Sequence, residues 1–388
     1  MIVVFDKKNQ RIPLKIWLKD LSQLEGTALE QAVTLTRLPF AYKQVALMPD
    51  AHVGYGMPIG GVLAAQDTII PYAVGMDIGC GMHAVKTEID SDQCRGTRLK
   101  NILGLIRTVI PQGFNWHKSA QRADVLDKMP LHLQLFQQEE KRVRKQLGTL
   151  GGGNHFIELQ KDEENNLWVM IHSGSRNIGK QTAEHFHKKA KEFCRKKKTD
   201  LLSNELAFLP VESKEGQDYL DSMHWCLEFA RESRRRMMEE VLDILQANDS
   251  DSVDIHHNYA VKEEHFGRSV WIHRKGATRA GAGERGVIPG SMGSASFIVS
   301  GRGNPESFLS CSHGAGRRMG RKAAKRKIGL ESVLKDLEKR GVEISCDNLR
   351  DLPEEASQAY KNIDQVMNQQ NDLVEVEVRL TPLGVVKG

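Results

Sequence analysis

Residues 74–85 read VGMDIGCGMHAV and place an acid, Asp77, three positions before a thiol, Cys80, among several glycines. Glycine costs backbone entropy in a helix or strand, so its repeated use indicates a loop that other atoms approach closely. Carboxylate and thiolate groups both bind divalent metal ions, and such a loop can aim both at one point. The stretch predicts a metal-binding loop, although Cys80 taken alone also fits a buried, inert thiol.

Several of the 14 histidines stand in short polar motifs, most of which also contain glycine. These histidines are His52 in PDAHVGYG, His155 in GGGNHFIE, His172 in IHSGSR, His256 and His257 in DIHHNYA, and His313 in SHGAGR. Each one alone is more typical of a hydrogen-bonded core histidine, but together with Asp77 and Cys80 they predict a transition-metal site. No spacing matches HExxH or a zinc finger, so spacing identifies neither the metal nor the reaction.

Three loops of Gly, Ser and Asn fit phosphate binding, because they expose backbone N–H groups, and each fits a tight turn equally well. They cover residues 147–158, 172–180 and 288–297, and none of them is a GxxxxGK[ST] loop. Arg176 and Lys275 are candidate phosphate contacts, and either also fits a surface ion pair.

Positive charge gathers in four runs, at 141–146, 188–198, 231–238 and 317–327, in a chain of net charge +5. A single run is typical of a solvated helix face, but four together favour a polyanionic partner. If 317–327 is helical, Arg318, Lys322 and Lys325 share one face and form a candidate contact with the phosphates of such a partner.

The elements that must position these residues alternate along the chain. Glycine- and histidine-rich stretches at 40–85, 147–180 and 254–316 contain short apolar runs typical of strands. Apolar spacing predicts helices at 97–110, 217–247 and near 353–369, and residues 373–380 alternate as a half-buried strand does. A site built from all three stretches requires one fold, so we predict a single α+β domain over 1–388, with a helical insertion at about 181–250.

Six scattered cysteines without a close pair argue against a disulfide framework. No run approaches the roughly 20 apolar residues that span a bilayer, and the N-terminus lacks the pattern of a signal peptide. We therefore expect a cytoplasmic protein with no membrane contact.

The motifs together resemble the RtcB family of RNA-splicing ligases from about residue 38 to the end. MPDAHVGYGMPIGG, AVGMDIGCGMHA, LGTLGGGNHFIEL, HSGSRNIG, HHNY, IPGSMGSASFIV, SHGAGR and the terminal VKG occur in the family's order. The resemblance implies central β-sheets flanked by helices around a deep metal- and nucleotide-binding cleft. It also implies an enzyme that joins RNA 2′,3′-cyclic phosphate or 3′-phosphate ends to 5′-hydroxyl ends, using GTP and two Mn²⁺ ions.

The resemblance further implies the roles of individual residues. Two metal ions would be held by Asp77, Cys80, His155, His172 and His257, with Cys80 between them. His313 would be the histidine that becomes guanylylated. The remaining guanylate contacts would come from Asn154, His155, Phe156, Glu158, His257, Asn258, Pro289, Gly290, Ser291, Met292, Ser296, Gly314, Ala315, Gly316, Tyr360 and Lys387.

Two other functions stay open at this stage. A two-metal phosphoesterase would use the same cluster to activate water and would need no nucleotide. A non-catalytic RNA-binding protein would need the basic runs but not the clustered metal ligands. We expect a monomer, with room for an accessory activating protein, and the motifs do not distinguish tRNA from rRNA or another RNA as the substrate.

Overall fold

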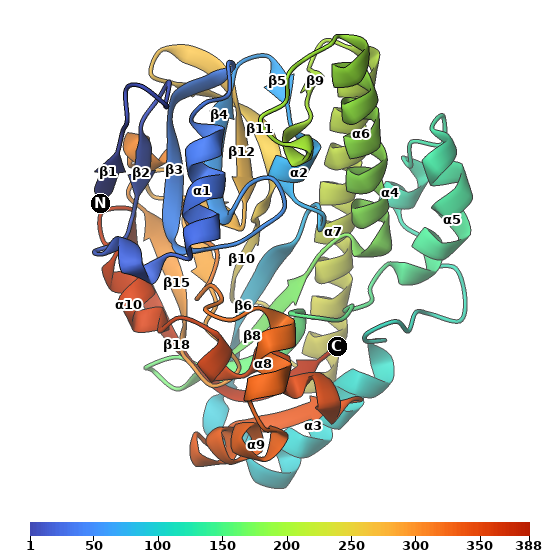
Figure 1. Ribbon diagram of the computed structural model, residues 1–388. Coiled ribbons are helices and arrows are strands. Elements are labelled where there is room, and N and C mark those ends of the chain that lie inside the picture. The colour runs from blue at the N-terminus through green and yellow to red at the C-terminus, as the bar shows by residue number, and fades with distance from the viewer.

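The computed structural model describes residues 1–388 and contains two main β-sheets with helices around them (Figure 1). The six-stranded sheet has the order β1 (Ile2–Val4), β2 (Leu14–Ile16), β3 (Ala41–His52), β4 (Ile59–Ala65), β12 (Arg268–Lys275), β11 (Asn258–His265). The eight-stranded sheet has the order β10 (Asp251–His256), β6 (Gly81–Asp90), β8 (Asn166–Ser173), β7 (Phe156–Lys161), β18 (Val374–Lys387), β15 (Ser296–Gly301), β14 (Arg285–Ile288), and β17 (Glu343–Cys346) pairs with β18.

The eight-stranded sheet curls until its first and last strands approach each other. Arg285 on β14 donates to both carboxylate oxygens of Asp251 on β10, at 2.6 and 2.9 Å. Apolar side chains from the strands, including Trp168, Ile298 and Leu380, form one buried cluster. The sheet is therefore nearly closed, and its strands end together along a common rim.

Helices cover the outer faces of both sheets (Figure 1). α1 (Gly26–Leu35) packs its buried alanines against the six-stranded sheet. The helices α6 (Arg176–Lys196) and α7 (Lys214–Leu245) pack against each other in one hydrophobic cluster. The C-terminal part of α7 packs against strands of the eight-stranded sheet in another cluster. The other helices are α2 (Pro71–Val74), α3 (Gly96–Val109), α4 (Asp124–Asp127), α5 (Gln134–Gln146), α8 (Arg321–Lys327), α9 (Leu330–Lys339) and α10 (Ile363–Asn368).

The α+β prediction and the predicted helices at 97–110 and 217–247 are confirmed by α3 and α7. α7 begins where the Ser213 side chain accepts from the Gly216 amide at 3.1 Å, which satisfies one of the free N–H groups of a helix start. It ends at Gln246, whose positive φ of 55° breaks the helix. None of the helices is both long and apolar enough to cross a lipid bilayer.

Two local predictions of secondary structure were wrong. The expected helix at 353–369 is divided into short 3₁₀ turns, η5 (Leu349–Glu355) and η6 (Ser357–Ala359), followed by α10. Pro353 removes a helical N–H donor, and Asn362 starts α10 anew by accepting from the Gln365 amide. Likewise α8 begins only at Arg321, so Arg318 is not on its face.

Candidate active site

Strand order explains how four side chains from distant parts of the sequence come together. Cys80 directly precedes β6, His155 directly precedes β7, and His172 is the penultimate residue of β8. β8 is antiparallel to both neighbours, and His172 pairs with Met82 on one side and with Phe156 on the other. The three ligand candidates therefore lie at the same rim of the eight-stranded sheet. His257 joins them from the connection between β10 and β11.

The metal-ligand candidates form a chain of short contacts with Cys80 in the middle. His155 Nε2 lies 3.0 Å from Asp77 Oδ2 and 3.5 Å from Cys80 Sγ. On the other side, Cys80 Sγ lies 3.2 Å from His172 Nε2, which in turn lies 3.4 Å from His257 Nε2. Cys80, His155 and His172 are all buried and form one compact group of possible ligands.

Hydrogen bonds to the backbone orient two of these imidazoles. His155 Nδ1 lies 3.1 Å from the Leu150 carbonyl, and His172 Nδ1 lies 3.0 Å from the Asn154 carbonyl. A carbonyl only accepts, so each Nδ1 carries the proton and each Nε2 offers a lone pair to the cluster. Burial holds the pKa of His172 well below its ordinary value, which keeps this ring neutral. The donors present fit a borderline transition-metal ion.

The glycines of this region admit close neighbours. A Cβ at Gly174 would lie 2.4 Å from Asp77 Oδ1, and a Cβ at Gly81 would lie 2.1 Å from the Ile255 carbonyl oxygen. Either methyl group would displace the loop that carries Asp77 and Cys80. These two glycines are therefore required for the approach of neighbouring segments to the cluster.

A buried arginine, Arg234 of α7, holds the loop that carries Asp77 and Cys80 by hydrogen bonds to backbone carbonyls. Its side chain is 0% exposed and donates to the carbonyls of Gly79 and Ser173, both at 3.1 Å. Its charge is balanced by Asp254, which accepts from Nε at 3.0 Å. The sequence places Arg234 within a basic run typical of a solvated face, and nothing local distinguishes it from its exposed neighbours.

His313 follows β16 (Ser310–Ser312), which pairs with β13 (Ala277–Arg279). Its ring centre lies 4.8 Å from that of His257, so His313 adjoins the metal-ligand candidates. Its Nδ1 lies 2.6 Å from Oδ2 of Asp50, a carboxylate with no solvent exposure. Asp50 was not predicted as a site residue, although it lies in the motif that contains His52.

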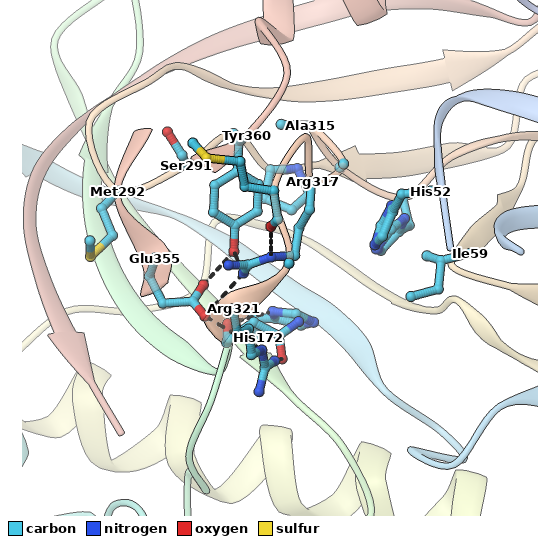
Figure 2. Close-up of a pocket in the computed structure, with 18 of the residues that line it drawn as sticks. His52, Ile59, His172, Ser291, Met292, Ala315, Arg317, Arg321, Glu355 and Tyr360 are labelled. Atoms are coloured by element: carbon cyan, nitrogen blue, oxygen red, sulfur yellow. Dashed lines mark hydrogen bonds and ion pairs between the residues drawn. The ribbon is translucent and has the colours of Figure 1, made fainter. Parts of the chain in front are cut away.

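A cavity of about 480 Å³ opens beside His313 and the metal-ligand candidates. Thirteen predicted residues line it: Asn154, Phe156, His172, Pro289, Gly290, Ser291, Met292, His313, Gly314, Ala315, Gly316, Tyr360 and Lys387. Figure 2 shows Tyr360, Arg317 and Glu355 grouped on one wall and His52 with Ile59 on another. The size and the mixture of rings, glycines and charges suit a nucleotide.

Glu355 organises the charged wall of this cavity. It accepts a hydrogen bond from Tyr360, lies 3.3 Å from Arg317 Nη1 and 3.9 Å from Lys387 Nζ. Arg317 also donates to the Tyr360 hydroxyl at 2.8 Å. Burial lowers the pKa of Lys387, and the nearby Glu355 carboxylate opposes that shift. Glu355 was missed because an acid in an expected helix normally faces solvent.

Several predicted contacts lie behind the cavity wall rather than on it. Glu158 is buried on β7, where Gln160 donates to it at 2.6 Å, and burial raises its pKa to about 8. Ser296 accepts from Gln160 at 3.0 Å and from the Gly290 amide at 3.2 Å. Asn258 donates to the Asp77 carbonyl at 3.0 Å. These side chains therefore support the loops that form the site.

The two predicted phosphate clamps hold backbone carbonyls instead. Arg176 donates to Thr149 Oγ1 at 3.0 Å and to the Gly113 carbonyl at 2.8 Å. Lys275 is buried and donates to the carbonyls of Tyr55 and Tyr72. Its burial lowers its pKa to about 7. Of the predicted RNA contacts, Arg318 and Lys322 are exposed without an ion pair, whereas Lys325 pairs with Asp351.

A buried thiol–imidazole cluster that could hold a metal ion, a carboxylate-bound histidine and a nucleotide-sized cavity are features of an enzyme that acts on nucleotides or nucleic acids. Comparison with known proteins identifies the family. The chain matches the family described as "tRNA-splicing ligase RtcB" over residues 31–134 and 128–388, and it belongs to the RtcB family.

Named relatives cover nearly the whole chain. It is 37% identical over 407 aligned residues to the RNA-splicing ligase RtcB of Escherichia coli K12, with 98% of each chain covered. It is 32% identical over 467 residues to the tRNA-splicing ligase RtcB of Thermococcus kodakarensis, covering 99% of this chain and 96% of the relative. The resemblance expected from residue 38 onward is confirmed and begins slightly earlier.

Proposed function

We propose that this protein is a GTP- and Mn²⁺-dependent ligase that joins RNA 3′-phosphate or 2′,3′-cyclic phosphate ends to 5′-hydroxyl ends. Family membership makes it an RNA ligase. The observation that carries the specific chemistry is the position of His313. It is held by Asp50 and stands between the metal-ligand candidates and a nucleotide-sized cavity.

Two metal ions would be held by Asp77 and His155 on one side and by His172 and His257 on the other, with Cys80 shared between them. The order of contacts, Asp77–His155–Cys80–His172–His257, supports this assignment. His257 Nδ1 is also buried without a partner. Burial and the Asp77 charge raise the pKa of Cys80, so a cation is needed to keep its thiolate. Bound Mn²⁺ would supply positive charge that offsets the charge of phosphate groups.

Asp50 orients His313 as a nucleophile. Its carboxylate accepts from Nδ1–H, which leaves the Nε2 lone pair free to attack the α-phosphorus of GTP. A bond forms between Nε2 and phosphorus, and pyrophosphate leaves. The positive charge that develops on the ring is stabilised by Asp50. Phe156, Tyr360 and Lys387 would hold the guanine, since they supply rings and a cation on one wall of the cavity.

The GMP held on His313 is then passed to an RNA 3′-phosphate, which restores the free histidine. The RNA 5′-hydroxyl attacks the activated 3′-phosphate, loses its proton, and GMP leaves as the phosphodiester forms. We further propose that the protein acts as a monomer in the cytoplasm, where a reducing environment keeps Cys80 a thiol. Whether tRNA, rRNA or another RNA is joined in the cell stays open.

The experiment is incubation with α-labelled GTP and Mn²⁺, followed by denaturing electrophoresis, for the wild type and for His313→Ala. A labelled wild-type band that is lost in His313→Ala, with metal content retained, supports ligase chemistry. A two-metal phosphoesterase would release phosphate from RNA ends without GTP and would give no labelled band. A labelled His313→Ala protein would show that the nucleophile is another residue.

A further inference from the structure

A second cavity of about 540 Å³ lies beside the nucleotide cleft. The two share three lining residues, Arg321, Glu355 and Lys387. One wall of the second cavity is the turn Gln112–Asn115, and another is the pair Gly152–Gly153. A flexible strand whose end reaches His313 can therefore continue into this space without leaving the protein surface.

The turn that forms the first wall is firmly anchored. The Gly113 amide donates to the Gly151 carbonyl at 2.8 Å, and the Gly113 carbonyl accepts from Arg176 at 2.8 Å. The Asn115 amide closes the turn on the Gln112 carbonyl at 3.0 Å. These bonds fix the backbone on both sides of Phe114.

Phe114 stands at the tip of this turn with its side chain fully in solvent. Its relative exposure is 103%, the largest among the exposed apolar side chains of the protein. Nothing in the fold buries the ring, yet the turn that presents it is held by three hydrogen bonds. A presented aromatic ring is the platform on which single-stranded nucleic acid bases stack.

The glycine wall offers donors for a phosphate. The amides of Gly152 and Gly153 donate to no backbone carbonyl and to no side chain. Both residues line the cavity, and Gly152 lies between two glycines of positive φ, Gly151 at 90° and Gly153 at 74°. Adjacent amides in such a backbone form an anion-binding concavity.

Each acidic side chain that lines the cavity contacts a basic partner, and Asp351 and Glu354 share one, Lys325. Asp347 pairs with Arg107, and Asp351 pairs with Lys325. Asn115 and Asn348 add amide groups to the lining. The far wall therefore suits a neutral ring with hydrogen-bonding edges rather than a free cation.

We propose that this cavity binds one unpaired nucleotide of the RNA next to the end being joined, with its base stacked on Phe114 and its phosphate on the Gly152–Gly153 amides. The inference rests on the proposed RNA ligase function. It assigns Phe114 a role in RNA binding and none in the reaction of His313 with GTP.

The test compares Phe114→Ala, Phe114→Trp and a matched control, Leu202→Ala. Leu202 is an exposed apolar side chain (40%) on the loop between α6 and η3 (Asn204–Leu206). We expect Phe114→Ala to raise KM for RNA about tenfold or more, the loss typical of one stacked base. Self-guanylylation of Phe114→Ala by GTP should stay at the wild-type level. Phe114→Trp should keep a KM for RNA near that of the wild type, and Leu202→Ala should change neither this KM nor self-guanylylation.

Binding is followed separately with two RNAs that carry 2-aminopurine, one before the 3′-phosphate and one after the 5′-hydroxyl. Stacking quenches this base, so we expect one of the two RNAs to be quenched by wild type and Phe114→Trp but not by Phe114→Ala. Wild-type KM together with unchanged quenching of both RNAs in Phe114→Ala would overturn the proposal. Quenching by a wild-type protein that joins no RNA would count against the ligase assignment and leave the binding site supported.

Discussion

His313 Nδ1 lies 2.6 Å from Oδ2 of Asp50, and the same carboxylate oxygen accepts from the His313 backbone amide at 3.1 Å. Two hydrogen bonds to one buried carboxylate fix both the tautomer and the position of the ring. Asp50 is separated from His313 by 263 residues. The two meet because β16, which directly precedes His313, packs beside β3, which carries Asp50.

Asp50→Asn should slow self-guanylylation about 100-fold or more. The amide is nearly isosteric, but it does not carry the negative charge that stabilises the ring after attack. The rate of labelling with α-labelled GTP measures the effect, with Mn²⁺ content as the control. Wild-type labelling by Asp50→Asn would mean that His313 needs no carboxylate partner.

Cys80→Ala should lower bound Mn²⁺ and abolish both guanylylation and ligation, because the thiol stands between the Asp77–His155 pair and the His172–His257 pair. A merely structural cysteine would instead cost about 1 kcal/mol of stability for the small cavity. Metal analysis beside thermal unfolding separates the two results. Full metal content with normal activity per folded molecule would contradict a ligand role.

Arg234→Ala should destabilise the protein by about 3–5 kcal/mol and reduce metal affinity, because the Asp254 charge loses its partner and two loop carbonyls lose their donor. Arg235→Ala is the matched control. Arg235 is about half exposed and pairs only with Glu232 and Glu239 on its own helix. Urea unfolding and metal titration of both variants test the prediction, and equal behaviour would contradict it.

Glu158 should make stability depend on pH. Burial raises its pKa from 4.5 to about 8, so the folded protein keeps a proton that the unfolded chain releases. The free energy of unfolding should therefore fall as pH rises from 4.5 to 8, and Glu158→Gln should flatten this decline. Urea unfolding of the metal-free protein across that range measures it. Parallel curves for both proteins would mean that Glu158 ionises normally.

Arg318 and Lys322 should contribute to RNA capture, since both are exposed, unpaired and close in sequence to His313. If each contacts one phosphate, replacing both with Ala should reduce the log–log salt slope of single-stranded RNA binding by about 1.4. Self-guanylylation should be unchanged. Lys325→Ala should have a smaller effect, because Asp351 and Glu354 already neutralise that charge. RNA titrations of the wild type and the variants at several salt concentrations test this prediction. An unchanged slope would mean that Arg318 and Lys322 only keep the surface soluble.

The donor types of the site could be predicted from the sequence because they are properties of single residues in short motifs. The motifs point to Asp77, Cys80, His155, His172, His257 and His313 together with His52 and His256, and the resemblance to the RtcB family separates the first six. The structure places these six side chains next to one another. The long amphipathic helices were predictable for a similar reason, since one buried face leaves a repeat in the sequence.

The partners of those residues were decided by the tertiary structure. The roles of Asp50, Arg234 and Glu355 depend on contacts with residues dozens to hundreds of positions away in the sequence. The residue type at each position does not indicate these contacts. The same reason applies to Arg176 and Lys275, which are candidate phosphate contacts in the sequence and which donate to the carbonyls of Gly113 and of Tyr55 and Tyr72 in the folded chain. Local chemistry selects which side chains can react, but a buried carbonyl or carboxylate that needs a partner is known only once the chain is packed.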